Sequence, residues 1–387
     1  MGFSLFKNKK EQSVVLDLDV ESIRVLVVEK GAGQNTIVNF YEQESKAWDN
    51  LKQGSLDFDV LKKDLTAVLK KLGLLKKLNK QEVIIGLPAE VLKAAVVKVS
   101  LEREDETAKI SKQEEAKIRE ALRHKAGQLL FEIIQKELGL EPHNFQILRH
   151  YILESKVSGY KVMSLFGMRG KQMEFKVLLV FALSSALNLA PKLVKDFALK
   201  NYSLRHPAEG LVGLLQKQKL LNSKILVDLR QNLTTIFLCN QILETISEFK
   251  VGSNHFIKSL KQNCKLTNSE TKSLVELLAE NKLSPGVKLK VEKALWPAFS
   301  LWQSNFVQYL KKKRKDLTFA PCQICFFKTS NILKELKTSI EKNQVSDNQL
   351  NAGFKFNDLE LSEFPVKIKQ GLHLPETALS MVILTFS

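Results

Sequence analysis

The same pattern of apolar and polar positions occurs at two places far apart in the chain. Apolar runs at 14–16 and 225–227 each end in an aspartate, Asp17 or Asp228, and two further apolar runs follow after short polar breaks. Those further runs cover 23–28, 35–41, 235–239 and 242–249. β-Branched runs with polar or glycine-containing breaks predict strands joined by turns. The repeat therefore predicts two related sheets, each opening with an antiparallel meander, and a functional site between them.

Between and after the two copies, helical spacing of apolar residues alternates with short strands. We expect Ser55 to cap a helix that runs to about Lys71, and a buried strand to follow at 83–85. The order meander, helix, strand suits a ribonuclease-H-like core. After the second copy, the pattern predicts helices at 254–263, 268–280 and 287–313, the last broken at Trp296-Pro297, then a strand at 323–327, a helix at 331–342 and a closing apolar segment at 378–386.

The section from 89 to 180 has a different pattern. It predicts an alternating strand at 91–99, one long helix at 112–137, and three strands at 146–153, 160–166 and 174–181. A single helix against a small sheet makes an α+β module, and this one looks inserted into the first lobe. The chain then returns through a helix at 186–199 and a second helix after Pro207.

Length and composition allow more than one domain. The chain has 387 residues, of which 44% are hydrophobic, so it can bury two or three cores. Lysine and arginine outnumber aspartate and glutamate by 59 to 42, and the net charge of +17 favours an acidic partner such as an anionic membrane, nucleic acid or an acidic peptide. Most of the lysines, however, are spread along amphipathic helices as solvated faces. Because no nucleic-acid-binding motif is present, we expect no nucleic-acid partner.

The chain shows no signal peptide, and its longest apolar run, 177–190, is shorter than the ~20 residues that cross a membrane. We therefore expect a cytoplasmic protein. Its four cysteines fit a reducing compartment, and we interpret the spacing Cys322-x-x-Cys325 as structural because residues three apart on a strand point to opposite faces. The six histidines have no metal-ligand spacing, so no metal site is predicted.

Several stretches carry a resemblance to a known superfamily. The opening VVLDLDVESIRVLVVE, its repeat ILVDLRQNLTTIFL and the following VGSNHFIKSL resemble the actin-like ATPase superfamily, and within it the FtsA and PilM branch. The section from VIIGLPAEVLKAAVVKV to LLVFALSSALNLAPKLVKDF resembles the SHS2 module of that branch, and LFGMRGKQMEFKV looks more like FtsA than PilM. The resemblance implies an α/β, actin-like (ribonuclease-H-like) two-lobed fold with an inserted α+β SHS2 module.

The resemblance also divides the chain into parts. Residues 1–88 are expected to begin the first lobe, 89–181 to form the SHS2-like module, 182–222 to return to the first lobe, and 223–387 to form the second lobe, with a helical insertion at about 254–315. Both junctions of the module fall beside strands. We therefore expect that 89–180 can be excised with a short linker and leave a folded remainder.

In the resembling family, nucleotide phosphates lie between two turns whose glycines let backbone N–H groups approach the anion. Here the glycines are missing, because Asp19 stands at one expected position and Arg230 and Asn232 stand at two others. The resemblance places the site at Asp17, Asp19, Ser22, Arg24, Asp228, Arg230, Asn232, Thr234, Thr235, Gly252, Lys328, Thr329 and Ser330. With crowded turns, we expect either no cofactor or weakly bound ATP with Mg²⁺, and no catalytic residue.

Two interpretations of Asp17 and Asp228 stay open. They either order a metal-nucleotide complex or accept N–H hydrogen bonds from the turns at the strand ends, and the crowded turns favour the second. Arg230 faces Asp19 across the predicted cleft, which predicts an ion pair that holds the cleft shut.

The resemblance implies an FtsA-like scaffold or adaptor in bacterial cell division, with a degenerate nucleotide site that makes it a pseudo-ATPase. A PilM-like component of type IV pilus assembly is the alternative, and an active actin-like ATPase is the third. The implied partners are proteins of the division or pilus machinery and further copies of the chain. Residues 1–10, with Phe3 and Phe6 ahead of Lys9 and Lys10, are either a contact with the inner face of the cytoplasmic membrane or a disordered start.

Overall fold

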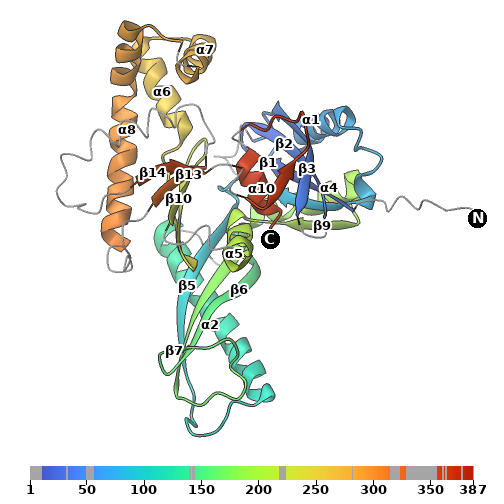
Figure 1. Cartoon of the computed structure of the whole chain (residues 1–387), viewed down its shortest axis with the longest axis vertical. Coiled ribbons are helices and arrows are strands. Elements are labelled where there is room, and N and C mark those ends of the chain that lie inside the picture. The colour runs from blue at the N-terminus through green and yellow to red at the C-terminus, as the bar shows by residue number, and fades with distance from the viewer. Residues whose placement is uncertain are drawn as a thin grey trace, which may run out of the picture.

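The computed structural model describes residues 11–31, 34–48, 56–138, 141, 144–217, 224–280, 282–313, 323–327, 355–359, 361, 364–375 and 378–386. Figure 1 shows three parts: a first lobe, largely blue, a second lobe with long orange and yellow helices, and a teal and green module that extends away from both lobes. The second lobe and the module each have a hydrophobic core, and the core of the first lobe extends onto the second-lobe sheet through Leu226, Phe237 and Leu243.

The first lobe is built on a six-stranded sheet in the order β15-β3-β2-β1-β4-β9. Its strands are β1 (Gln12–Leu18), β2 (Ser22–Glu29), β3 (Asn35–Glu44), β4 (Glu82–Gly86), β9 (Asn201–Leu204) and β15 (Val366–Ile368). The predicted meander is confirmed, since β1 pairs antiparallel with β2 and β2 with β3. β1 and β2 are almost continuously apolar because they are buried on both faces of the sheet.

Short helices complete the first lobe. They are α1 (Phe58–Lys71), the 3-10 turn η2 (Leu78–Lys80), α3 (Ser184–Leu187), α4 (Leu189–Phe197), α5 (Pro207–Lys217) and α10 (Leu379–Leu384). The residue that caps α1 is Asp57, whose Oδ1 accepts the N–H of Val60 at 3.0 Å. The predicted cap, Ser55, is two residues too early and lies outside the described residues.

The last part of the chain returns to the first lobe. β15 pairs in parallel with β3, and α10 packs against α5. Gly210 and Gly213 of α5 allow this approach, because a Cβ at either position would lie 2.0 Å from the carbonyl oxygen of Ile383 or Phe386. The prediction that the second lobe runs to residue 387 is therefore wrong at this end.

The second lobe is built on a five-stranded sheet in the order β12-β11-β10-β13-β14. Its elements are β10 (Lys224–Leu229), β11 (Thr234–Asn240), β12 (Ile242–Phe249), α6 (Ser253–Cys264), α7 (Asn268–Ala279), α8 (Pro285–Lys313), β13 (Gln323–Phe327) and β14 (Lys355–Asp358). The predicted break of α8 at Pro297 is wrong, because Leu295 before it and Trp302 after it are anchored in the same core. Neither α8 nor any other described helix is long and apolar enough to span a membrane.

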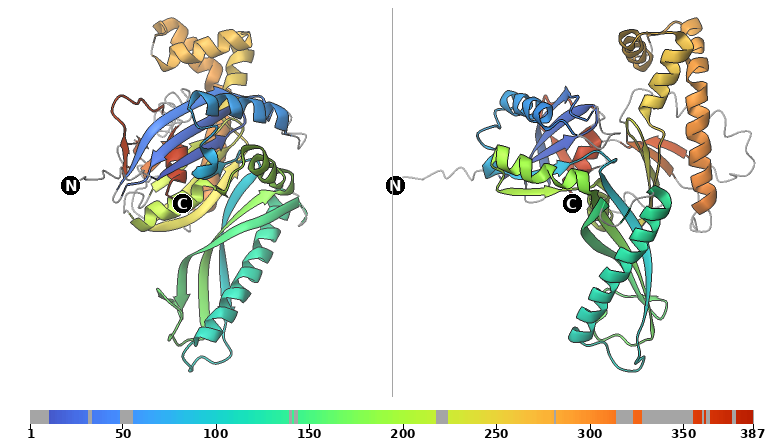
Figure 2. Two further views of the ribbon diagram at one scale, coloured as in Figure 1. Left: turned by 90° about the vertical axis from the view of Figure 1, so that its right-hand side faces the viewer. Right: turned by 180° about the vertical axis from the view of Figure 1, so that it is seen from behind.

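The module has a four-stranded antiparallel sheet in the order β5-β8-β6-β7, with one long helix along it (Figure 2). Its elements are β5 (Leu92–Glu102), α2 (Lys112–Leu138), β6 (Phe145–Val157), β7 (Tyr160–Lys161) and β8 (Gln172–Leu183). The strand predicted at 160–166 is only the two residues of β7. The chain then turns away at Gly167 and Gly170, which both have positive φ. Identification of the module as SHS2 stays a prediction.

The module is attached to both lobes. The inner ends of β5 and β8 enter the core of the first lobe through Leu92, Leu178 and Val180. Lys93 and Lys176 form ion pairs with Glu248 and Glu244, both on β12 of the second lobe. The hydrophobic core therefore crosses the predicted junctions of the module.

Candidate functional site

The turns after β1 and β10 meet between the lobes, where charged side chains are buried. Asp17 stands opposite Arg24 in the register of β1 and β2. Nη2 of Arg24 lies 2.6 Å from Oδ2 of Asp17 and 2.6 Å from Oδ2 of Asp19. These three side chains are only 3–4% exposed. Their attraction is therefore little screened by water.

The second lobe contributes two more charges to this place. Nε of Arg230 donates to Oδ2 of Asp228 at 2.8 Å, and Nη1 of Arg230 lies 3.9 Å from Oδ1 of Asp19. The predicted ion pair between Arg230 and Asp19 is therefore present. We call the five side chains Asp17, Asp19, Arg24, Asp228 and Arg230 the cleft cluster.

Burial and neighbouring charges act in opposite directions within the cleft cluster. Burial raises the pKa of Asp17 above its ordinary value, and Arg24 only partly offsets this. Burial would also raise the pKa of Asp19, but Arg24 and Arg230 together hold that pKa below its ordinary value. The pKa of Arg230 is raised despite burial, because Asp228 and Asp19 favour its charged form.

The turn between β10 and β11 packs against the start of α6. The N–H groups of Ser253 and Asn254 donate to the carbonyl oxygens of Arg230 and Gln231, each at 2.8 Å. Gly252 permits this contact, because a Cβ there would lie 2.4 Å from either carbonyl oxygen. N–H groups at the start of a helix commonly bind anions, but the N–H groups of Ser253 and Asn254 already donate to the neighbouring turn.

Other residues predicted for the site serve the structure of the lobes. Oγ1 of Thr234 donates to the carbonyl oxygen of Val251 at 2.6 Å and accepts from Nε1 of Trp302 at 2.9 Å, so it belongs to the core of the second lobe. Thr235 and Ser22 are buried in β11 and β2. The predicted residues Lys328, Thr329 and Ser330 lie outside the described part of the chain.

Polar contacts connect the parts around the cleft. Nδ2 of Asn232 donates to Oε1 of Glu90 at 3.1 Å, and Nδ2 of Asn254 donates to Oε1 of Glu21 at 2.9 Å. Of these four residues, only Asn232 was predicted for the site. The partners are 142 and 233 residues apart, so no local pattern connects them.

A second candidate site lies where two sheets present open edges to each other. β6 pairs with β8 along its length, whereas on its other side only Lys156 and Val157 pair with β7. β9 pairs with β4 on one side. Within the described residues, β6 over 145–154 and β9 thus have unpaired edges, and Nη2 of Arg149 on β6 donates to the carbonyl oxygen of Leu204 on β9. We call the two facing edges the edge site.

A buried carboxylate, Glu209 of α5, lies beside the edge site. Arg149 donates to both of its oxygens, at 2.6 and 2.9 Å, and the hydroxyl of Tyr151 donates at 2.6 Å. Nη1 of Arg205 lies 3.2 Å from its Oε1. These donors outweigh burial and hold the pKa of Glu209 below its ordinary value. Sequence reasoning missed this cluster, although the spacing His206-x-x-Glu209 resembles a helix-capping pattern.

Comparison with solved structures identifies the fold. A chain of the PilM-PilN type IV pilus biogenesis complex has a TM-score of 0.66 with this chain at 11% sequence identity, and the match covers 96% of this chain and 97% of that one. This chain has the actin-like ATPase fold. At this level of identity the likeness concerns the fold alone, and the more specific FtsA assignment stays a prediction.

Other solved structures are similar at lower TM-scores. A Bacteroides thetaiotaomicron protein with actin-like ATPase fold and unknown function has a TM-score of 0.44 at 11% identity, covering 99% of both chains. MreB 5 of Spiroplasma citri bound to AMPPNP also has a TM-score of 0.44 at 11% identity, covering 90% of this chain and 91% of that one. Neither a family model nor a curated protein matches the sequence.

An actin-like fold implies Mg²⁺ and ATP between the lobes, but the residues in this cleft do not fit them. The carboxylates that would order a metal ion already bind the two arginines of the cleft cluster. The N–H groups at the start of α6 are engaged by the neighbouring turn. In the described part of the chain, no group of three or more His, Cys, Asp and Glu side chains is arranged to hold a metal ion. The cleft cluster therefore acts as a contact between the lobes.

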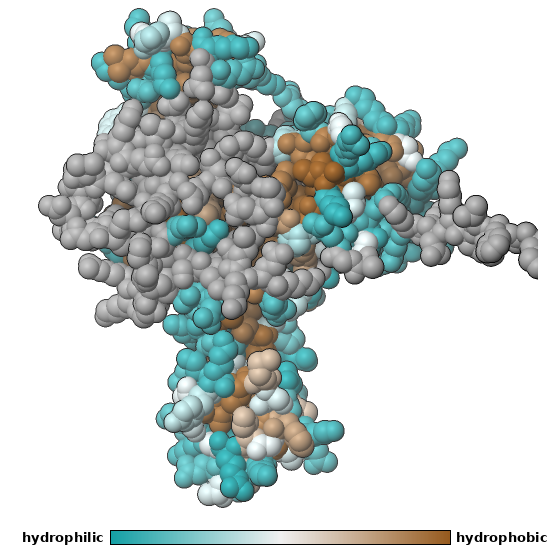
Figure 3. All heavy atoms as spheres, in the orientation of Figure 1, coloured by the Kyte–Doolittle hydropathy of each residue, from teal (hydrophilic) through white to brown (hydrophobic). Residues whose placement is uncertain are grey.

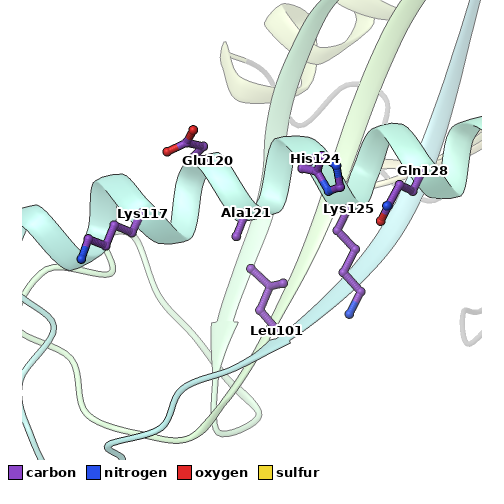
Figure 4. A pocket seen from close by; sticks show the side chains of 7 residues that line it. All are labelled: Leu101, Lys117, Glu120, Ala121, His124, Lys125 and Gln128. Atoms are coloured by element: carbon purple, nitrogen blue, oxygen red, sulfur yellow. The ribbon is translucent and has the colours of Figure 1, made fainter.

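The helix of the module carries a shallow surface depression. It is lined by Leu101, Lys117, Glu120, Ala121, His124, Lys125 and Gln128. Figure 4 shows that its charged side chains point in different directions, and Nζ of Lys125 donates to the carbonyl oxygen of Ser100 at 2.7 Å. This arrangement offers no converging groups for catalysis.

β7 and the loop after it expose large apolar side chains at the far end of the module. These are Tyr160, Met163, Phe166 and Met168. Figure 3 shows hydrophobic side chains gathered among hydrophilic ones on this module. Such a surface is typical of contact with another protein.

Proposed function

We propose that this chain is an actin-fold adaptor that holds an extended segment of a partner protein at the edge site and does not turn over ATP. The observation that carries the proposal is the unpaired edge of β6 over 145–154, which faces the open edge of β9. Unpaired strands offer backbone N–H and C=O groups, and an extended segment satisfies them by adding a strand.

The side chains of β6 suit a short segment rather than a second copy of the chain. Leu148, Tyr151 and Leu153 pack against the core of the first lobe, whereas Ile147 and Ile152 pack against the core of the module. Both faces of β6 are thus covered, and its edge is the part left open. The register shifts after Ile147 and Ile152 interrupt the edge, which disfavours continuous pairing with another long strand.

The partner that we favour is a component of a pilus-assembly machinery, because the similar solved structure is of PilM in a complex with PilN. An FtsA-like scaffold in cell division is the second candidate, and it rests on the stretch LFGMRGKQMEFKV in the loop before β8 and the start of β8. In either role, the partner would bring the protein to the inner face of the cytoplasmic membrane. Affinity purification from native cells distinguishes pilus from division partners.

A library of ten-residue peptides tests the edge site. Peptides selected for binding to the intact protein are expected to slow amide hydrogen exchange in 145–154 and 201–204, because an added strand protects both edges. Exchange in 112–138, the helix α2, is the internal control and should not change. Protection confined to other segments would contradict the proposal.

Calorimetric titration with Mg-ATP tests whether the protein binds ATP, and a hydrolysis assay tests whether it turns ATP over. We expect no heat of binding and no magnesium-dependent hydrolysis, because among the described residues Arg24 and Arg230 face aspartates of the cleft cluster and the N–H groups of Ser253 and Asn254 donate to the neighbouring turn. Tight, magnesium-dependent binding would support the active-ATPase alternative instead.

A further inference from the structure

Positive charge exceeds negative charge in the side chains around Glu209, where the two open edges meet. We propose that the docked segment presents a carboxylate at this place and that Arg149 and Arg205 bind it. The inference rests on the docking function proposed above and adds the chemistry of the partner.

Glu209 itself is fully occupied by groups of the protein. Its Oε1 accepts from Nε of Arg149 at 2.6 Å, from the hydroxyl of Tyr151 at 2.6 Å and from Nη1 of Arg205 at 3.2 Å. Its Oε2 accepts from Nη2 of Arg149 at 2.9 Å and from the backbone N–H of His206 at 2.8 Å. The side chain of Glu209 is 1% exposed. It therefore belongs to the wall of the site.

Two guanidinium groups share this one carboxylate. Nη1 of Arg149 and Nη2 of Arg205 have no hydrogen-bond partner among the described residues. The two side chains are 28% and 24% exposed, so an incoming group can reach them. One arginine would suffice to balance the charge of Glu209, and the second is left to balance a charge that comes from outside.

The position of the two arginines suits a segment that lies along the edges. Arg149 lies on β6, and its Nη2 donates to the carbonyl oxygen of Leu204, the last residue of β9. Arg205 directly follows β9, and its Nη1 lies 3.1 Å from the hydroxyl of Tyr151 on β6. A segment that pairs with either edge would bring its side chains to these guanidinium groups. Carboxylates form short, charge-assisted hydrogen bonds with guanidinium groups.

Other charges nearby do not cancel this excess. His206 is buried and uncharged at neutral pH, since burial lowers its pKa to about 3. Lys93 pairs with Glu248, and Arg230 pairs with Asp228, so these cations are already balanced by carboxylates. The excess of positive charge therefore lies at Arg149 and Arg205, which share Glu209.

The peptide library selected on the intact protein also tests this inference. We expect the bound peptides to be enriched in Asp or Glu at one position, or to need a free C-terminal carboxylate. Replacement of the acidic residue by its amide and amidation of the C-terminus distinguish these two sources. Removal of whichever carboxylate binds the arginines, side-chain or C-terminal, should weaken peptide binding about 10-fold or more, as for other hydrogen bonds to charged groups.

Arg205→Gln is the variant that probes the protein side. It leaves Arg149 and Tyr151 on Glu209, so the fold should be kept. We expect it to weaken the binding of acidic peptides about 10-fold and to leave the binding of their amide versions unchanged. Arg119→Gln is the matched control, because Arg119 forms an exposed pair with Glu115 on α2, and it should bind both peptides as the unmodified protein does.

The results separate the inference from the docking function. Peptides that protect the edges without preferring a carboxylate, or that bind Arg205→Gln as tightly, would overturn acid recognition and leave the docking function standing. Failure to obtain any peptide that protects the edges would overturn both.

Discussion

At the scale of single residues, the buried charges between the lobes are stable only as a set. Three aspartates would repel one another without Arg24 and Arg230, and each arginine would be costly to bury alone. The raised pKa of Asp17 and the lowered pKa of Asp19 follow from this balance. Removal of one charged side chain of the cleft cluster should therefore lower the free energy of unfolding by more than its few contacts suggest.

Arg230→Gly is expected to destabilise the protein strongly. The change leaves Asp228 buried without the cation that it faces, and Asp19 keeps only Arg24. The free energy of unfolding should fall by about 3–5 kcal/mol, as is usual when a buried charge loses its partner. Urea unfolding measures this, with Arg119→Gln as an exposed control. Mg-ATP binding should not appear in Arg230→Gly, because the N–H groups of α6 stay engaged; unchanged stability would show that the pair does not hold the lobes together.

His206 is expected to make stability depend on pH. Its Nδ1 accepts the N–H of Ala208 at 3.1 Å, which requires an uncharged ring, and burial lowers its pKa from 6.5 to about 3. Because the unfolded chain binds the proton more readily, the stabilisation is complete above pH 6.5 and is lost as the pH falls from 6.5 towards 3. The slope is at most about 1.4 kcal/mol per pH unit.

Urea unfolding at a series of pH values checks this dependence. His206→Gln should flatten the slope below pH 6.5, whereas His124→Gln, on the exposed side of α2, should keep it. An equal slope in all three proteins would assign the pH dependence to other groups.

At the scale of elements, the contact between α5 and α10 depends on glycines. Gly213→Ala should destabilise the protein by about 1–3 kcal/mol, because its Cβ would lie 2.0 Å from the carbonyl oxygen of Phe386. Gly127→Ala in α2 is the matched control. Its Cβ would meet Cδ1 of Ile147 at 3.6 Å, an ordinary contact, so alanine should stabilise this helix by about 0.5–1 kcal/mol. Melting temperatures that rise in both variants would contradict the close approach of α10.

At the scale of the whole molecule, the module is less separable than its different sequence pattern suggests. Excision of 89–180 would remove Leu92, Leu178 and other side chains from the first-lobe core. We therefore expect this deletion to aggregate, contrary to the expectation from sequence. A shorter deletion of 97–177 joins Val96 to its register partner Leu178 through a two-residue turn. It keeps Leu92 and Leu178 in the core and should aggregate less, although it still removes Arg149 and Tyr151 from Glu209. Circular dichroism and size-exclusion chromatography distinguish the two, and a folded longer deletion would show that the shared core is dispensable.

Much of the element order could be predicted because apolar periodicity is a local property of the chain. Both meanders and the long helix of the module are present where the pattern placed them. The errors lie where distant contacts override a local signal. Pro297 stays within α8 because both halves of the helix pack into one core, and β9 is a four-residue edge strand too short for the pattern to reveal.

The sequence alone shows that the two turns carry Asp19, Arg230 and Asn232 where the resembling family has glycine. Crowding of both turns by side chains could therefore be predicted. The pairing of Arg230 with Asp19 also could be predicted, since both flank the repeated motif. The Glu209 cluster, the bridge from Asn232 to Glu90 and the open edge of β6 could not. Their partners are 60 and 142 residues apart, and they meet only because the module and the two lobes pack at particular angles, which no local pattern encodes.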